Sequence, residues 1–286
     1  MKNILFASVS AAALLIGVPA MAHNNNSTIT QTGANVANVS QTGQNDTSSI
    51  NQATEPGVSS GGTVNVTQTG PMGNTPTVTT VADGNLEPPE NTVNVTQTDD
   101  GLTSAPAGAA NYSIVNQDNV NLGTEATVNQ NNNASVGDFG QNYSQITQGR
   151  NASNGDVSVT QNGSGNTSYY SAGTSNNNDA FINQQGGLNL SNVIQNFQGA
   201  GALAIVEQSN TSPVTGNSAY IEQISAGYSA NPAEFALGAD ARIYQTGDSH
   251  SSSISQTGYS DVPAEANFAR NQQFGENHGS SISQSG

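Results

Sequence analysis

One short pattern recurs along most of the chain and constrains its fold more than any other feature. It reads Ser, Ala or Val, any residue, Ile or Val, any residue, then Gln, as at residues 27–31, 37–41 and 252–256. Sixteen copies occur, and the Ile or Val precedes the Gln by two positions in every copy. A recurrence of this kind is typical of repeat proteins, in which each unit packs only on its neighbours.

The repeated residues fall into three sets with different expected roles. The Gln residues are expected to form a stacking ladder: Gln31, Gln41, Gln52, Gln68, Gln97, Gln117, Gln130, Gln148, Gln161, Gln184, Gln195, Gln208, Gln223, Gln245, Gln256 and Gln284. The β-branched residues are expected to form the core: Ile29, Val39, Ile50, Val66, Val95, Val115, Val128, Ile146, Val159, Ile182, Val193, Val206, Ile221, Ile243, Ile254 and Ile282. Glycines two positions after the Gln are expected at corners: Gly33, Gly43, Gly70, Gly163, Gly186, Gly247 and Gly258.

The alternation of these residues predicts strands. A period of two places the small residue, the Ile or Val and the Gln on one face of an extended segment. One such strand buries too little to be stable, but identical strands stacked about 4.8 Å apart form an apolar column and a ladder of amides. Many successive Gln residues lie 10 to 13 positions apart, which fits a short strand plus a turn. The sequence therefore predicts an all-β, cross-β solenoid of roughly eight to ten two-stranded coils.

The repeat is interrupted in places. Segments rich in Pro, Gly and acidic residues at 53–62, 71–91 and 99–110 are predicted to be insertions at corners. Where the Gln spacing doubles, degraded strands are predicted to fill the gap, at 168–172 and at 233–237.

The first 22 residues differ from the rest. Lys2 precedes an apolar run over residues 4–18, and Ala20-Met21-Ala22 is a small-x-small cleavage signature. This pattern predicts a secretory signal peptide over 1–22, cleaved after Ala22, followed by a repeat array over 23–286. The apolar run is too short for a membrane span, and no later stretch is long and apolar enough either.

Composition narrows the function. Charged residues make up 8% of the chain, apolar residues 33%, and the net charge is −16. The negative sign disfavours binding to nucleic acid. No Cys is present, and His23, His250 and His278 lie in polar segments without ligand spacing, so they are expected to be exposed. The sequence thus predicts no catalytic cluster, metal site or cofactor. A disordered low-complexity tract is the alternative that composition alone permits.

One coil resembles a known family. Ser27, Gln31 and Gly33, followed by Asn35, Ala37 and Gln41, follow the order of the repeat in curlin, the major subunit of curli fibres. The resemblance covers most of residues 23–286 at the level of the motif. It implies an extracellular functional amyloid subunit of a Gram-negative bacterium, exported through an outer-membrane pore with periplasmic chaperones and polymerised on a nucleator subunit. The fibres would serve in biofilm matrix, adhesion and cell aggregation.

Three functions therefore stand as hypotheses. The first is a self-assembling fibre subunit that adds strands at an unpaired edge. The second is a monomeric secreted solenoid that acts as an adhesin or binding module. The third is an enzyme on a β-helix, which the lack of a convergent charged cluster disfavours.

Overall fold

The computed structural model describes fifteen segments of the chain. They are residues 25–32, 35–43, 45–54, 62–70, 74–82, 91–99, 111–119, 124–132, 141–149, 155–173, 178–196, 202–212, 215–225, 239–258 and 268–285. The expected signal peptide over 1–22 and the corner residue Gly33 lie outside these segments.

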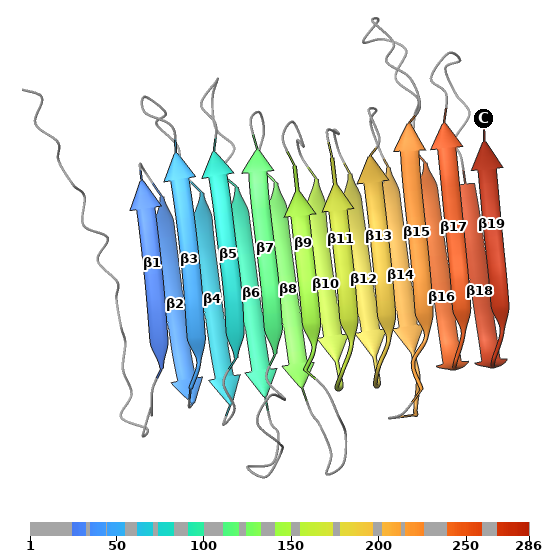
Figure 1. The fold of residues 1–286 in the computed structure, drawn as a ribbon, viewed down its shortest axis with the longest axis horizontal. Coiled ribbons are helices and arrows are strands. Elements are labelled where there is room, and N and C mark those ends of the chain that lie inside the picture. The colour runs from blue at the N-terminus through green and yellow to red at the C-terminus, as the bar shows by residue number, and fades with distance from the viewer. Residues whose placement is uncertain are drawn as a thin grey trace, which may run out of the picture.

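The described residues form nineteen strands in two parallel sheets (Figure 1). One sheet contains the ten odd-numbered strands in order from β1 to β19, and we call it the odd sheet. The other contains the nine even-numbered strands from β2 to β18, the even sheet. The strands are β1 (Asn26–Thr32), β2 (Val36–Gly43), β3 (Thr47–Thr54), β4 (Thr63–Gly70), β5 (Thr75–Ala82), β6 (Thr92–Asp99), β7 (Tyr112–Asn119), β8 (Glu125–Asn132), β9 (Tyr143–Gln148), β10 (Asp156–Asn162), β11 (Thr167–Ala172), β12 (Asp179–Gln185), β13 (Leu190–Asn196), β14 (Leu203–Ser209), β15 (Ser218–Ser225), β16 (Asp240–Asp248), β17 (Ser251–Gly258), β18 (Phe268–Glu276) and β19 (Gly279–Ser285).

This arrangement confirms the predicted all-β solenoid. The chain passes from one sheet to the other at every corner, so two consecutive strands make one coil (Figure 1). Each strand pairs in parallel with the next strand of its own sheet. Where both strands carry the motif, core residue lies opposite core residue and Gln opposite Gln. Ten strands in one sheet and nine in the other amount to nine coils and one further strand, within the expected range.

The core lies between the sheets. Along β4, Val64, Val66 and Gln68 point inward and are buried, while Thr67 between them is exposed. The Ile and Val of successive strands form one continuous apolar cluster. Ile29, Val39 and Ile282, on the outermost strands, are only partly buried because no strand covers them on one side.

Two strands occupy segments in which the sequence predicted none. The predicted insertion over 71–91 contains β5, where Val78 is fully buried in the core but Thr80 stands at the Gln position. β18 has Asn271 at the Ile or Val position, paired with Ile243. β5 lacks the Gln and has Pro76 at the small-residue position, and β18 lacks the Ile or Val, yet each is paired along the sheet with a neighbouring strand in register. The predicted boundaries also shift, because β3 extends to Thr54 and β6 to Asp99.

Of the two predicted degraded strands, one lies within the described residues and one does not. The segment 168–172 lies in β11, which pairs with β9 and β13, so this prediction is confirmed. The segment 233–237 lies outside the described residues. Gln223 and Gln245, which flank it, sit on consecutive strands β15 and β16 of opposite sheets.

The corners that follow β10, β12, β16 and β18, from the even to the odd sheet, are short. After β10, Gly163 and Gly165 have φ angles of 114° and 71°, and Asn166 immediately precedes β11. A Cβ on Gly163 would lie 2.0 Å from the carbonyl oxygen of Gly186 in the next coil. Glycine at this corner therefore serves both a left-handed backbone and close stacking of coils. Leu188 adopts a φ of 56° at the equivalent of Gly165.

Candidate functional site

The candidate site is the pair of glutamine ladders that run through the interior. In each ladder the Nε2 of one Gln donates to the Oε1 of the Gln in the next coil toward the C-terminus. In the even sheet these bonds join Gln41–Gln68 (2.9 Å), Gln97–Gln130 (2.8 Å), Gln130–Gln161 (2.8 Å), Gln161–Gln184 (2.9 Å), Gln184–Gln208 (3.0 Å), Gln208–Gln245 (2.9 Å) and Gln245–Gln273 (3.0 Å). In the odd sheet they join Gln31–Gln52 (2.7 Å), Gln117–Gln148 (2.9 Å), Gln195–Gln223 (2.8 Å), Gln223–Gln256 (3.0 Å) and Gln256–Gln284 (2.8 Å).

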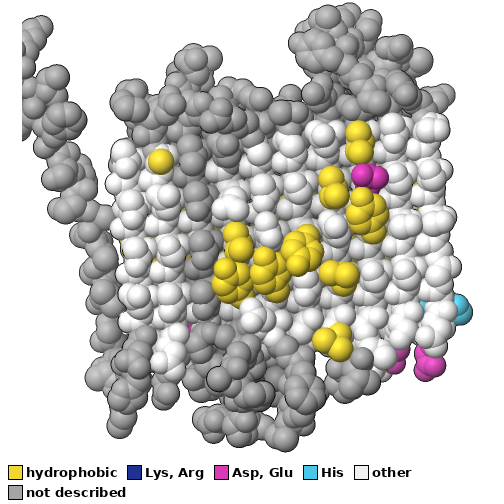
Figure 2. Space-filling view, viewed as in Figure 1, with side chains coloured by type: hydrophobic (Ala, Val, Ile, Leu, Met, Phe, Trp, Pro, Cys, Tyr) yellow, Lys and Arg dark blue, Asp and Glu magenta, His cyan; other side chains and the backbone are white. Residues whose placement is uncertain are grey.

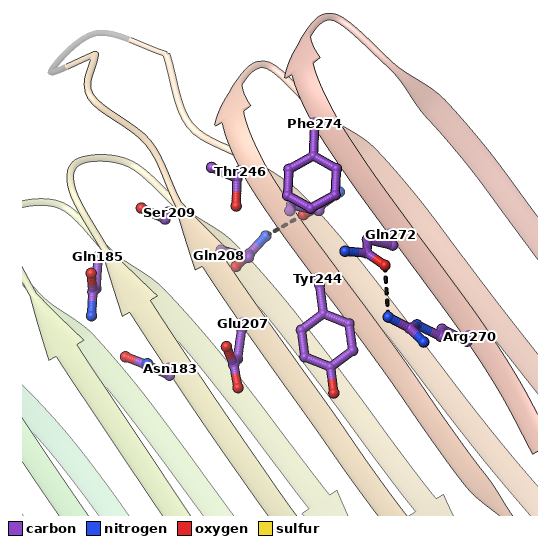
Figure 3. Close-up of a pocket in the computed structure, with 11 residues that line it drawn as sticks. Asn183, Gln185, Glu207, Gln208, Ser209, Tyr244, Thr246, Arg270, Gln272 and Phe274 are labelled. Atoms are coloured by element: carbon purple, nitrogen blue, oxygen red, sulfur yellow. Dashed lines mark hydrogen bonds between the residues drawn. The ribbon is translucent and has the colours of Figure 1, made fainter.

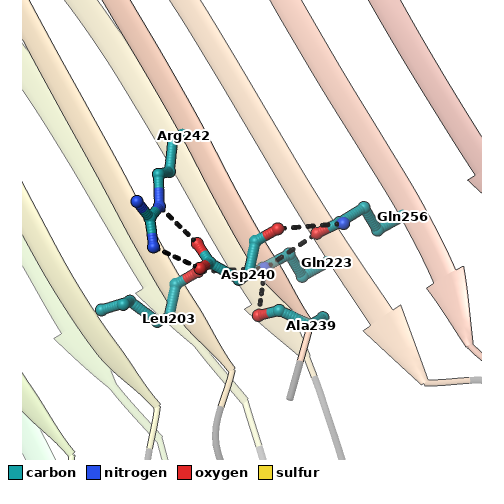
Figure 4. A network of polar contacts seen from close by, with 6 residues as sticks. All are labelled: Leu203, Gln223, Ala239, Asp240, Arg242 and Gln256. Atoms are coloured by element: carbon teal, nitrogen blue, oxygen red, sulfur yellow. Dashed lines mark hydrogen bonds and ion pairs between the residues drawn. The ribbon is translucent and has the colours of Figure 1, made fainter. Parts of the chain in front are cut away.

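The same amides also tie the two sheets together. Gln223 Nε2 donates to the carbonyl oxygens of Ala239 (2.8 Å) and Leu203 (3.3 Å), and Gln256 Nε2 donates to that of Asp240 (3.2 Å) (Figure 4). Leu203 starts the even-sheet strand before β15, and Ala239 immediately precedes the even-sheet strand after it. Each buried Gln side chain is therefore held along its own sheet and across to the other, which satisfies polar atoms deep in the core.

The ladder is interrupted at three places. Thr80 in β5 and Ala172 in β11 stand where the odd sheet would have Gln. The next Gln residues toward the C-terminus, Gln117 and Gln195, have buried Oε1 atoms without a hydrogen-bond partner among the described residues. In the even sheet, Gln68 Nε2 bonds Asn74 O at 2.7 Å, and the Oε1 of Gln97 is left without a partner in the same way.

At one interruption a tyrosine replaces the missing amide. Tyr170 takes the Ile position of β11, is fully buried, and its hydroxyl donates to Asn178 O at 3.5 Å. Asn178 O is the carbonyl that precedes β12, equivalent to Gly155 O and Ala202 O, to which Gln148 and Gln195 donate. Burial raises the pKa of Tyr170 well above its ordinary value, with Asp179 adding to the effect, so the phenol stays neutral.

A second ladder, which the sequence analysis did not predict, lies at the end of the corner that precedes each odd-sheet strand. Its members share one position, six residues before the ladder position of that strand. Examples of its bonds are Asn111 Nδ2 to Asn74 Oδ1 (3.1 Å) and Asn189 Nδ2 to Asn166 Oδ1 (3.0 Å). The full column is Asn25, Asp46, Asn74, Asn111, Asn142, Asn166, Asn189, Asn217, His250 and His278. The spacing from Asn to Gln is present in the sequence and would have revealed it.

His250 corrects an expectation. The sequence predicted an exposed side chain, but His250 is 1% exposed and its ring stacks on that of His278 at 5.4 Å. Its Nε2 lies 3.1 Å from Thr246 O, and its Nδ1 accepts from the backbone N–H of His278. The two histidines therefore continue the asparagine column rather than lie free in a loop. His278 is exposed, as predicted, and His23 lies outside the described residues.

The outer faces of the two sheets carry different side chains. On the odd sheet, the rings of Tyr112, Tyr143 and Tyr169 lie side by side with centroids 5.5 Å apart, within an apolar patch over the middle of the sheet (Figure 2). On the even sheet, Glu125, Asp156 and Asp179 are neighbours in one column. Burial, Asp179 and Glu125, in that order, raise the pKa of Asp156.

The even sheet bears an open groove of about 300 Å³ lined by polar and aromatic side chains, including Glu207, Tyr244 and Phe274, in which Arg270 donates to Gln272 Oε1 at 2.7 Å (Figure 3). Across the described segments, no three His, Cys, Asp or Glu side chains are grouped to hold a metal ion. No helix among the residues that the structure describes is long and apolar enough to cross a membrane.

The ladders end open at both sides of the described array. At the N-terminal side, the Oε1 atoms of Gln31 and Gln41 have no donor among the described residues, although each amide donates into the ladder. At the C-terminal side, Gln284 accepts from Gln256 and donates only to Phe268 O, at 2.7 Å. The outer edges of β1, β2, β18 and β19 pair with no other described strand. One end thus offers acceptors and the other offers donors.

The fold and these ladders define the class of protein, a two-sheet parallel β-solenoid with open strand edges. Comparison of the chain with protein-family models, with curated proteins and with solved structures finds no match.

Proposed function

We propose that this chain is the structural subunit of an extracellular, curli-like amyloid fibre that forms biofilm matrix and mediates adhesion and cell aggregation. The observation that carries the proposal is the complementarity of the two ends. Unpaired edges with Gln acceptors at one side and Gln donors at the other suit head-to-tail addition of identical chains. The resemblance of the repeat to curlin supports the same function.

Assembly would extend the contacts already present inside one chain. Each added molecule completes the backbone pairing of the previous edge, covers its partly exposed Ile and Val, and continues both ladders. The negative charge of the chain opposes this association and keeps monomers soluble until an edge is offered. In this proposal the fibre lies at the cell surface of a Gram-negative bacterium, with a secretion pore, periplasmic chaperones and a nucleator as partners by resemblance. The proposal assigns the chain no catalysis.

Fibre diffraction tests the assembly. The chain lacking residues 1–22 is incubated without stirring, and the product is aligned and exposed to X-rays. Reflections near 4.7 Å along the fibre and near 10 Å across it are expected from stacked strands and packed sheets. A solution that stays clear and monomeric throughout would refute the proposal.

A variant pair tests the role of the ladder ends. Gln31→Ala with Gln284→Ala removes one ladder amide from each growing end, so elongation from added seeds is expected to slow several-fold. The matched control, Thr30→Ala with Ser283→Ala, alters the outward neighbours of the same two strands and is expected to elongate like the parent. Elongation is followed by light scattering at fixed seed concentration. Equal rates for both variants would count against a ladder role in growth.

The aromatic patch on the odd sheet favours a second candidate, a monomeric adhesin. Exposed rings in a row form a binding surface without any assembly, and Tyr169 and Leu190 are each about two-fifths exposed, 39% and 41%. A monomeric adhesin is expected to sediment as a single species with the mass of one chain at all concentrations.

A further inference from the structure

The two ends of the described array belong to the same sheet. β1 and β19 are both strands of the odd sheet, which therefore extends beyond the even sheet at each end. This follows from the odd number of strands, ten in one sheet and nine in the other. A stack of copies of residues 23–286 has to accommodate this extra described strand at every junction.

The coils are helical rather than flat, which sets the height of each strand. Gln68 of β4 donates to Thr47 O, at the start of β3, and to Asn74 O, just before β5. Gln117 of β7 likewise reaches Thr92 O of β6 and Thr124 O, just before β8. Each strand thus lies about half a strand spacing, roughly 2.4 Å, above the previous strand in the opposite sheet. Figure 1 shows the same stagger of even between odd strands.

Simple translation of one chain onto the next does not fit these heights. If β1 of a second copy pairs with β19, the odd sheet continues at one spacing. In the even sheet, however, β2 of the second copy then lies two spacings, about 9.6 Å, beyond β18. One strand is missing there, and the backbone groups of both edges have no partner. Buried backbone groups without partners are strongly disfavoured.

We propose that successive chains stack with a half-turn about the long axis of the solenoid, so that the odd sheet of one copy continues as the even sheet of the next. β1 of the second copy then pairs with β18, and its β2 pairs with β19. Both sheets continue at one spacing without a gap. This inference rests on the proposed fibre function and specifies the geometry of its subunit contact.

The inner faces of the sheets permit this exchange. Eight of the sixteen motif copies lie in each sheet, with the same succession of small residue, Ile or Val, and Gln. At the junction, Ile282 would face Val39 of the next copy, and Gln284 would donate to its Gln41. Gln273 of β18 would donate to its Gln31. The direction of donation matches that of every glutamine-ladder bond among the described residues.

Disulfide trapping distinguishes the two junctions, because the chain contains no Cys. Thr28, Asn38 and Ser281 are exposed, and each lies three positions before the Gln of its strand. With the half-turn, Ser281 lies beside Asn38 of the next copy. With translation, it lies beside Thr28 instead. Neighbours one spacing apart fall within the Cα separation that a disulfide spans, whereas the other pair lies on opposite sheets.

The experiment compares two double variants without residues 1–22. Fibres of Asn38→Cys with Ser281→Cys are oxidised and dissolved without reductant, and covalent oligomers larger than dimers are expected. Fibres of Thr28→Cys with Ser281→Cys are expected to give no such series. The three single variants are the controls, since one Cys per chain can yield only dimers.

Helical reconstruction of parent fibres gives an independent measure. The half-turn predicts a rise of nine and a half strand spacings, about 46 Å per chain, with a rotation near 180°. Translation predicts about 48 Å with little rotation. Cross-β fibres in which Thr28→Cys links to Ser281→Cys, or in which neither pair links, would overturn the half-turn and leave the fibre function standing. Failure of the parent itself to form fibres would instead overturn the function.

Discussion

At the scale of the residue, the buried Gln explains why so polar a chain can have a core. A Gln side chain carries two donors and one acceptor oxygen, and the solenoid supplies partners for them along and across the sheets. Gln161 accepts from Gln130, and donates to Gln184 Oε1 (2.9 Å) and Tyr143 O (2.9 Å). A residue of another shape would leave neighbouring amides without partners in the core, where the cost is largest.

Gln161→Ala is therefore expected to destabilise the solenoid. The substitution leaves Gln184 Oε1 without its donor and opens a small cavity, at about 1 to 3 kcal/mol for each polar group that loses its partner. The free energy of unfolding is measured with guanidinium on freshly purified chain. Thr160→Ala, one position away on the outer face, is the control and is expected to change stability by less than about 0.5 kcal/mol. Equal effects of the two substitutions would contradict an energetic role for the ladder.

At the scale of the strand, the sequence could predict the repeat but not every member of it. The fold class and the sixteen motif-bearing strands could be predicted from the Ile or Val and the Gln, because these residues make the contacts that recur. β5 and β18 did not, since Thr80 and Asn271 replace a motif residue. They form strands because neighbouring strands, paired in register, supply backbone hydrogen-bond partners. This contribution comes from the neighbours and cannot be predicted from the residues of β5 and β18 themselves. The asparagine column has a constant spacing to the Gln position, but it lies at the corner, outside the alternating pattern of the strands.

β11 provides an element-scale prediction, because Tyr170 and Ala172 act together. Ala172→Gln alone is expected to destabilise, since the ring of Tyr170 already reaches the carbonyl that a Gln would bond. Tyr170→Ile combined with Ala172→Gln restores the motif and offers a donor to the unpartnered Gln195 Oε1. The double variant is expected to be at least as stable as the parent, with a coupling of about 1 to 3 kcal/mol in a double-mutant cycle by guanidinium unfolding. Additive effects would show that the two positions do not compensate each other.

The carboxylate column on the even sheet makes stability depend on pH. Because the pKa of Asp156 is raised in the fold, the folded chain binds a proton at this group more readily than the unfolded chain. Stability from this group is thus greatest below the ordinary carboxyl pKa and is lost as pH rises through the raised value. Acidification from pH 7 toward pH 4 is expected to raise the melting temperature through this group, and Asp156→Asn should flatten that rise.

Glu207→Gln is the matched control for that measurement. It removes one negative charge from the same sheet, but its column neighbours are Asn183 and Tyr244 rather than carboxylates. The control is expected to keep the pH dependence of the parent. Thermal melts by circular dichroism across the pH range compare the three chains, and an unchanged slope in Asp156→Asn would contradict repulsion within the column.

At the scale of the whole molecule, the direction of the glutamine ladders and the odd number of described strands govern how chains stack. All glutamine-ladder bonds among the described residues donate toward the C-terminus, so the two ends of the array are chemically different. The odd number of described strands adds a second asymmetry, because one sheet overhangs at both ends. The common direction of the glutamine ladders requires head-to-tail stacking. The odd number of described strands then decides the rotation between copies. Neither property depends on the identity of any single residue.

Removal of the last strand is therefore expected to change the symmetry of the fibre rather than abolish it. Without residues 277–286, β1 to β18 remain, nine strands in each sheet, and coils that pack only on their neighbours should stay folded. The next copy then continues each sheet by translation, with a rise of nine spacings, about 43 Å, and little rotation. In this shortened chain, Arg270→Cys should form a disulfide with Asn38→Cys of the next copy, because both lie in one column of the even sheet. In the full array, Arg270→Cys should instead form a disulfide with Thr28→Cys of the next copy. Helical reconstruction and non-reducing gels measure both outcomes, and a half-turn that survives the deletion would show that strand parity does not set the stacking.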